Sequence, residues 1–423
     1  MYKKQRKRPT MENRDVDATP AVSPQESGDF ITYRYRWVIL AVVSLLCVSV
    51  ELHYLTFASI TGEAAKFYQV SDFSINQISI LFMLLLVILS LPAAYLINKL
   101  GLYKGIGFGA VLVGIFSVVK GMYANDFTVV FYTSMFIAVA QPFIVTSATR
   151  VCAVWFPARE RTTVSGVITF SQFIGMGVAM SFSSVIAQNE GIPSLLWIYG
   201  LISLVISIIF LVFMRDKPPT PPCLEGDDVR LSFREGLRHC FKTPSAVILI
   251  YTFFIGTGVY NAVSTCIEQI LRPHQLGMGV IGLMGGVLLV VAMIGTFIWA
   301  VVSDKMRKRK PALFLGSLLF IPGLVLLNVA SSFTLVVVAC VLLGLAAGTG
   351  ALGYQYAAEI TFPAPETISQ SIIMISGSIS GILFVVAMNA FGDFIVQSLY
   401  IFAALIAVGL MLQLKLKETL GSN

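Results

Sequence analysis

The chain has 423 residues, of which 57% are hydrophobic and 12% are charged, and its formal net charge is +7. Soluble domains are about 45–50% apolar with about 25% charged residues, so this chain has too few polar side chains to cover a water-soluble globule. With a mean hydropathy of +0.83, it is predicted to be an integral membrane protein.

Residues 1–36 form a polar, proline-containing segment that begins with a run of lysines and arginines. We expect a disordered basic tail in the cytoplasm. A cleavable signal peptide would have an apolar core close behind its basic start, and this segment has none. The first membrane helix should therefore act as the insertion signal.

Twelve apolar segments are long enough to cross a bilayer. A spanning helix needs about 20 mostly apolar residues, because each residue rises about 1.5 Å across roughly 30 Å of hydrocarbon. The alternating pattern of a membrane barrel is absent from the sequence. We therefore expect an all-α polytopic membrane protein. Its expected spans are 37–60, 76–97, 103–123, 127–149, 163–187, 194–214, 245–268, 280–302, 311–330, 333–358, 367–390 and 394–414.

The positive charge is distributed asymmetrically along these segments. All lysines and arginines except Lys66, Lys120 and Arg272 fall in the tails and loops on the side of the N-terminus. This is the positive-inside pattern of a multi-pass protein, and it predicts that both termini are cytoplasmic. The charge thus reflects topology in the cell membrane, and nucleic acid binding is not expected.

A proline-rich and then charged segment divides the chain into two halves. We expect an N-terminal six-helix bundle over 37–214, a cytoplasmic linker over 215–244 and a C-terminal six-helix bundle over 245–414. A short cytoplasmic tail over 415–423 follows. Within the linker, LSFREGLRHCF is either a short amphipathic helix on the membrane surface or unstructured.

The two halves share an internal repeat with an offset of 206 residues. Phe156-Pro157-Ala158-x-Glu160 returns as Phe362-Pro363-Ala364-x-Glu366. The same offset relates Tyr54 to Tyr260, Gly175 to Gly381, and Asn98-Lys99 to Asp304-Lys305. A parallel repeat of six helices is typical of major facilitator transporters, whose substrate site lies between the halves at mid-depth. Two pseudo-symmetric bundles of this fold are therefore predicted.

Two loops resemble the signature that this superfamily carries on its cytoplasmic side. These are AYLINKLGLYK (94–104), in which an asparagine replaces the usual acid, and AVVSDKMRKRK (300–310), which keeps the acid but lacks the glycine. Such an acid can hold a neighbouring helix N-terminus or a basic side chain while the cytoplasmic side is closed. The candidate gate residues are Asn98, Lys99, Arg150, Asp304 and Glu359. Alternatively, Arg150 and Glu359 only mark helix ends at the lipid headgroups.

Four strings resemble one family within the superfamily. They are AVAQPFIVTSATRVCAVWFPARE (138–160), GVYNAVSTCIEQI (258–270), GYQYAAEITFPAPE (353–366) and SGILF (380–384). They are similar to the feline leukaemia virus subgroup C receptor-related transporters, and the similarity runs from about residue 36 to 390. The resemblance implies transport of choline, ethanolamine or another small nutrient, and haem and pyridoxine are also associated with the family.

The resemblance also implies a substrate site. In that family an aromatic residue on helix 1, a glutamine on helix 5, a tyrosine on helix 7 and a glutamine on helix 11 surround the substrate. The matching positions here are Tyr54, Gln172, Tyr260 and Ser378. The family's tryptophan has become Tyr54 and its second glutamine has become Ser378, which weakens the case for choline in particular. Gln172 and Ser378 are again 206 residues apart.

The chemistry of these positions leaves alternatives open. Two tyrosine faces in a dry cavity can hold a cation with about 2 kcal/mol, although Tyr54 and Tyr260 could instead be ordinary interfacial tyrosines. Gln172, as a mid-bilayer amide, needs a partner that is either another helix or a ligand.

Glu51 and His53 are the most unusual polar residues in the spans. An acid inside a spanning helix costs roughly 2.5–3.5 kcal/mol, so it usually faces a cavity or a partner. Glu51 could attract a cationic substrate or carry a coupled proton, with His53 as its polar neighbour. Alternatively, Glu51 pairs with Lys120.

These observations predict a secondary transporter that moves a small organic nutrient by rocker-switch alternating access. An organic cation such as choline or ethanolamine is the first candidate substrate. The alternatives are a proton-coupled exporter of drugs or organic anions, and a non-transporting ligand sensor on a carrier scaffold. The sequence shows no catalytic constellation, P-loop or metal-ligand cluster, so neither an enzyme nor a cofactor is expected. Expected partners are the small-molecule substrate and the lipid bilayer, and we expect a monomer.

Overall fold

The computed structural model describes residues 33–157, 160–220, 233–362, 364, 366–390 and 395–418. All regular elements in these ranges are helices. Most of the predicted N-terminal tail, the middle of the linker and the last five residues lie outside the described residues, so the expectations for them stay predictions.

The first bundle, here called the N-terminal bundle, consists of α1 to α7. Two of the predicted spans, 163–187 and 194–214, form one element because the chain continues through Gly191, whose φ is +84°. This left-handed conformation suits glycine and turns the chain back on itself. The bounds are α1 Arg36–Tyr54, α2 Thr61–Tyr68, α3 Asp72–Leu100, α4 Leu102–Met122, α5 Phe127–Val145, α6 Ala148–Trp155 and α7 Arg161–Phe213.

The C-terminal bundle consists of α9 to α17 and is preceded by α8 (Phe233–Lys242) in the linker. The helix α8 shows that residues 233–242 of this segment are helical, and its Cys240 is buried against Ala364 and Ile368. The expected location on the membrane surface stays a prediction. The bounds are α9 Pro244–Thr265, α10 Ile267–Leu271, η2 Arg272–His274, α11 Met278–Met306, α12 Arg309–Leu318, α13 Phe320–Val329, α14 Phe333–Ala347, α15 Gly350–Ile360, α16 Glu366–Ala390 and α17 Ile395–Gln413.

The repeat seen in the sequence is also present in the helix bounds. Both α3 and α11 have 29 residues, and they begin at Asp72 and Met278, which are 206 positions apart. The starts of α5 and α14, at Phe127 and Phe333, have the same offset. Each of these two starts is fixed by a polar cap: the side chain of Asp126 accepts from the N–H of Thr128, and Ser332 accepts from Leu335. Equivalent local signals therefore set equivalent helices.

The first helix of each bundle is followed by a short separate helix, and the two short helices begin at positions that are 206 residues apart. The helix α1 ends at Tyr54, and α2 begins only at Thr61; α9 ends at Thr265 and α10 begins at Ile267. The predicted span over 37–60 is present, but its helix ends earlier than expected, at Tyr54. Hydroxyl groups satisfy part of the freed backbone, since Ser79 donates to the Tyr54 carbonyl and Thr61 to the Phe57 carbonyl. Such local bonds let a helix break inside a membrane protein.

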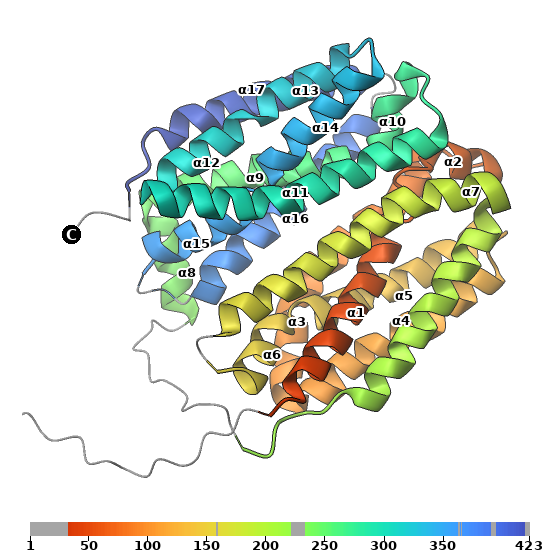
Figure 1. Cartoon of the computed structure of the whole chain (residues 1–423), viewed down its shortest axis with the longest axis horizontal. Coiled ribbons are helices and arrows are strands. Elements are labelled where there is room, and N and C mark those ends of the chain that lie inside the picture. Colours follow the sequence, from red (N-terminus) through yellow and green to blue (C-terminus); the bar gives the residue numbers. More distant parts are fainter. Residues whose placement is uncertain are drawn as a thin grey trace, which may run out of the picture.

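The two bundles lie side by side, with α7 next to α11 and α3 next to α16 (Figure 1). The short helices α2 and α10 lie together at one end of the molecule, whereas α6, α8 and the C-terminal segment lie at the other (Figure 1). Large apolar side chains such as Ile88 and Phe297 are exposed on the helices. Such exposed apolar surface is typical of helices that face lipid.

Candidate functional site

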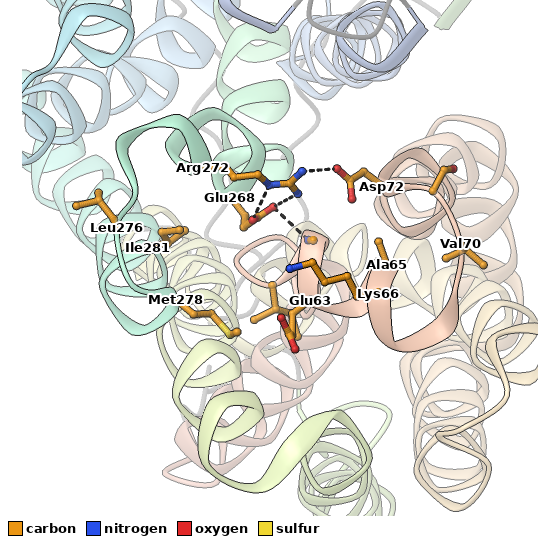
Figure 2. Close-up of a pocket in the computed structure, with 13 residues that line it drawn as sticks. Glu63, Ala65, Lys66, Val70, Asp72, Glu268, Arg272, Leu276, Met278 and Ile281 are labelled. Carbon is orange, nitrogen blue, oxygen red and sulfur yellow. Dashed lines mark hydrogen bonds and ion pairs between the residues drawn. The ribbon is translucent and has the colours of Figure 1, made fainter.

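Charged residues join the two bundles where α2 meets α10. Arg272 donates from Nη1 to Asp72 Oδ2 of α3 at 2.9 Å and from Nη2 to Glu268 Oε2 at 2.7 Å (Figure 2). The N–H of Gly62 donates to the same Glu268 oxygen at 3.1 Å. Bonds to Glu268 and Asp72 raise the pKa of the Arg272 guanidinium further above its usual range. We call this group of residues, Gly62, Asp72, Glu268 and Arg272, the α2–α10 seal.

A layer of neutral amides lies next to the seal and also crosses the two bundles. Asn76 of α3 donates from Nδ2 to Gln269 Oε1 at 3.0 Å and to Asn389 Oδ1 of α16 at 3.3 Å. Gln269 in turn donates to Asn389 at 3.1 Å. Buried amides of this kind must find partners inside the protein. Here the partners come from opposite bundles, so the amides hold this end closed.

Close backbone packing accompanies the polar contacts. A Cβ added at Gly282 of α11 would lie 1.9 Å from Ser184 Oγ and 2.7 Å from the Met180 carbonyl oxygen of α7. At Gly286 it would lie 2.0 Å from Ser181 Oγ. Only glycine allows α7 and α11 to approach this closely. Together with the seal, this packing closes the end of the molecule that carries α2 and α10.

A pocket of about 490 Å³ opens beside the seal (Figure 2). Its charged lining residues come from both bundles and are of both signs: Glu63, Lys66, Asp72, Glu268 and Arg272. Arg272 and two of the acids are already engaged with each other. The pocket is therefore a rim feature of the closed end, away from the tyrosines that the sequence singled out.

Tyr54 and Tyr260, the symmetry-related tyrosines, meet between the bundles. Tyr54 is the last residue of α1, is 9% exposed, and packs on Phe82 with ring centroids 5.7 Å apart. Electrostatic interactions connect its hydroxyl with Tyr260 and Thr265 of α9 in the other bundle. The buried Tyr260 hydroxyl has no hydrogen-bond partner among the described residues. A ligand could supply that missing partner.

Glu51 lies one helical turn before Tyr54 and is only 3% exposed. Its Oε1 accepts a hydrogen bond from Nε2 of Gln141 on α5 at 3.0 Å. The predicted alternative, an ion pair with Lys120, is not found: Lys120 Nζ lies 5.2 Å from the centre of the Phe57 ring and has no hydrogen-bond partner in the described parts of the chain. Sequence reasoning missed Gln141, although its position before Pro142 within a spanning helix was a usable signal.

The other three predicted site residues are placed differently. His53 is buried in the N-terminal bundle, where its Nε2 lies 2.9 Å from Ser203 Oγ of α7. Gln172 is half-buried on α7 and forms no hydrogen bond with another described residue. Ser378 is buried, and its hydroxyl donates to the Met374 carbonyl of its own helix at 3.1 Å. The structure thus brings Tyr54, Tyr260 and Glu51 together, and His53 faces a different neighbour.

Residues 30–278, more than half of the chain, match the sequence profile of the Major Facilitator Superfamily. The chain belongs to the Major Facilitator Superfamily. Its relatives include solute carrier family 49 member A3 of Xenopus tropicalis, 28% identical over 375 residues, covering 84% of this chain and 78% of the relative. The human choline/ethanolamine transporter FLVCR2 is 26% identical over 393 residues, covering 88% of this chain and 74% of the relative. The predicted relationship is confirmed.

Solved structures show the same fold. A bacterial homologue of the human lysosomal transporter Spinster matches with a TM-score of 0.74 at 15% identity, covering 90% of this chain and 97% of the homologue. The predicted all-α fold of this superfamily is confirmed, and so is a multi-pass membrane protein. As a major facilitator transporter, the chain is not an enzyme. In the ranges that the structure describes, no group of three His, Cys, Asp or Glu residues could hold a metal ion.

The superfamily's loop signature places its residues at the end opposite the seal. Arg150 of α6 donates to Asn98 Oδ1 at 2.6 Å, whereas Lys99 is exposed. In the other bundle Arg309, which sequence reasoning missed, donates to both Asp304 and Glu359 at 3.1 Å. Arg309 belongs to a basic run over 305–310 and is its buried member. No local pattern in the sequence shows which residue of the run is buried. Each of these bonds lies within one bundle.

Arg309→Ala is expected to lower the stability of this major facilitator chain. The variant loses charge-assisted hydrogen bonds to Asp304 and Glu359, which contribute about 2 kcal/mol together after solvent screening of the exposed Asp304. Thermal unfolding in detergent should show a midpoint several degrees below that of the wild type. Lys308→Ala, which changes an exposed neighbour, is the matched control. Equal midpoints for the two variants would show that Arg309 is not a stabilising centre.

Proposed function

We propose that this chain is a carrier for a small organic cation of the choline or ethanolamine class. The observation that carries the proposal is the meeting of Tyr54 and Tyr260 between the bundles, with the buried Glu51 one turn away. Several relatives are named as choline/ethanolamine transporters, among them the human and the rat protein. Their identity of 25–26% supports the transporter class and makes this substrate the first to test.

The chemistry of the three residues suits a cation. A cation between two tyrosine faces gains about 2 kcal/mol when it is desolvated. The unpartnered Tyr260 hydroxyl can accept from or donate to a substrate hydroxyl or amine. Glu51 supplies negative charge in a region of low dielectric, where electrostatic attraction is strongest. Gln172 and Ser378, which are related by the repeat, complete the proposed site as hydrogen-bonding groups.

The proposed transport step is a rocking movement of the two bundles, taken as 37–214 and 245–414, about this site. The distribution of lysine and arginine supports cytoplasmic termini and a linker over 215–244, so we assign the α2–α10 end to the outside of the cell membrane. Opening to the outside then requires the seal and the amide layer to separate. Asn98, Lys99, Arg150, Asp304 and Glu359 would act at the cytoplasmic end. We propose that the monomer is the transporting unit.

The test is uptake by liposomes that contain the purified full chain. Radiolabelled choline, ethanolamine, pyridoxine, haem and a monocarboxylate are compared with protein-free liposomes. Saturable uptake of choline or ethanolamine that the other compounds do not match would support the proposal. Uptake of an anion alone would overturn it, and choline binding without any flux would identify a sensor instead.

A further inference from the structure

The carboxyl group of Glu51 has no cationic partner, although it is buried in the membrane-spanning part of the protein. The structure shows no Lys, Arg or His nitrogen within 4.0 Å of it in the residues that it describes. Its partner is the neutral amide of Gln141. One amide donor leaves most acceptor positions of a carboxylate empty. An isolated charge in such a place is strongly unfavourable.

Gln141 can serve both protonation states of Glu51. Its Nε2 donates to the ionised carboxylate, and its Oε1, which is buried and has no partner, can accept the O–H of the protonated acid. An amide carries donors and an acceptor in one planar group. The unpartnered Oε1 therefore gains a hydrogen bond when Glu51 is protonated. The pair is built to hold a proton and also to release it.

The groups around Glu51 do not fix its charge. From its own helix the titratable neighbours are Cys47, His53 and Tyr54, and His53 bonds to Ser203. The helix α4 contributes Lys120, which lies over the Phe57 ring, and α7 contributes Gly175, which has no side chain. From the C-terminal bundle come Tyr260 and Cys266, which interact with Tyr54. A cation that arrives between the tyrosines is thus the missing counter-charge.

We propose that Glu51 and Gln141 form a proton-exchange switch at which a proton and the substrate cation take turns, so that the carrier exchanges one cation for one proton. This inference rests on the proposed function, because it requires a cation at Tyr54 and Tyr260. When the cation binds, the O–H bond of Glu51 breaks, the proton passes to water on the open side, and the electron pair stays on the carboxylate. When the cation leaves on the other side, the carboxylate takes up a proton from water there. Net charge movement is zero.

Choline is the probe for the test, because its quaternary ammonium cannot cross the membrane as a neutral base. Proteoliposomes that are one pH unit more acidic inside should accumulate choline about tenfold, since one pH unit is worth 1.36 kcal/mol. Under the same conditions a pH-sensitive dye inside the liposomes should report alkalinisation when external choline is added. Choline uptake that neither follows the pH gradient nor moves protons would overturn the switch and leave the proposed function standing. No flux of choline or ethanolamine under any gradient would instead refute the proposed function.

Two variants connect the exchange to these residues. Glu51→Gln is expected to carry choline down its gradient without alkalinisation and without accumulation in acidic liposomes. Gln141→Leu should keep accumulation but shift the pH at which uptake is half-maximal, which a purely structural role would not do. Glu63→Gln, which changes an exposed acid on α2, is the matched control and should behave like the wild type. Choline accumulation by Glu51→Gln equal to that of the wild type would overturn the switch by assigning the proton to another group. If Glu51→Gln does not fold, the alkalinisation measured with the wild type still decides whether choline exchanges for a proton.

Discussion

Gly282→Ala is expected to shift the carrier by about 2 kcal/mol, or roughly 30-fold, away from the conformation closed at the α2–α10 end. The added Cβ would lie 2.7 Å from the Met180 carbonyl oxygen, which is backbone and cannot rotate away. The strain exists only while α7 and α11 are together, so separating the bundles relieves it. Choline uptake should fall because the carrier less often reaches the conformation closed at the α2–α10 end, which its transport cycle requires.

The measurement is the distance between spin labels on the two bundles at this end. Lys66→Cys and Gln275→Cys provide exposed attachment sites, in a chain whose native cysteines are replaced by alanine. Gly282→Ala should increase the population at long distance. Gly279→Ala is the control on the same helix, because its Cβ would meet only Gln188 at an ordinary 3.5 Å. A distance distribution unchanged by Gly282→Ala would refute the role given to this packing.

Tyr260→Ala is expected to raise the KM for choline about 30-fold, which corresponds to the loss of about 2 kcal/mol from one ring's cation attraction and the hydroxyl's hydrogen bond together. Tyr260→Phe keeps the ring and removes only the hydroxyl. Since that hydroxyl has no protein partner and is proposed to bond the substrate hydroxyl, the phenylalanine variant should show a smaller rise in KM for choline, about fivefold for the loss of about 1 kcal/mol. The two substitutions together separate the ring from its hydroxyl.

Initial uptake rates over a range of choline concentrations give both constants. Tyr400→Ala is the control, because Tyr400 is 46% exposed on α17, away from the space between the bundles. If Tyr260→Ala and Tyr400→Ala had the same KM, the tyrosine pair would not be the cation site. A fall in maximal rate at unchanged KM would place Tyr260 in the conformational change instead.

Local patterns in the sequence were sufficient to locate the membrane-spanning helices, although not every point at which a helix ends. Hydropathy gives each span independently of the others, and the offset of 206 residues fixes the relation between the bundles. The break after Tyr54 could not be predicted from hydropathy, because residues 55–60 are as apolar as a helix and the hydroxyls that compensate the break include Ser79 of another helix. In residues 55–60, hydrogen bonds to another helix therefore outweigh the tendency of an apolar segment to continue as a membrane helix.

Contacts between distant segments were beyond the reach of sequence patterns. Glu51 was recognised as an outlier, but its partner Gln141 is 90 positions away, and the sequence suggested Lys120 as the partner instead. The partners of Arg309 and the inter-bundle bond of Glu268 were not predicted, for the same reason. Their roles depend on which helices adjoin them, which requires the packed structure.

The bond between Gly62 and Glu268 shows where the two copies of the repeat must differ. The two residues occupy the same position in the two copies, so each meets its own counterpart across the pseudo-twofold axis. Glutamate at both positions would place two like charges together, which repel. This contact therefore depends on asymmetry between the copies: one supplies a backbone N–H and the other a carboxylate.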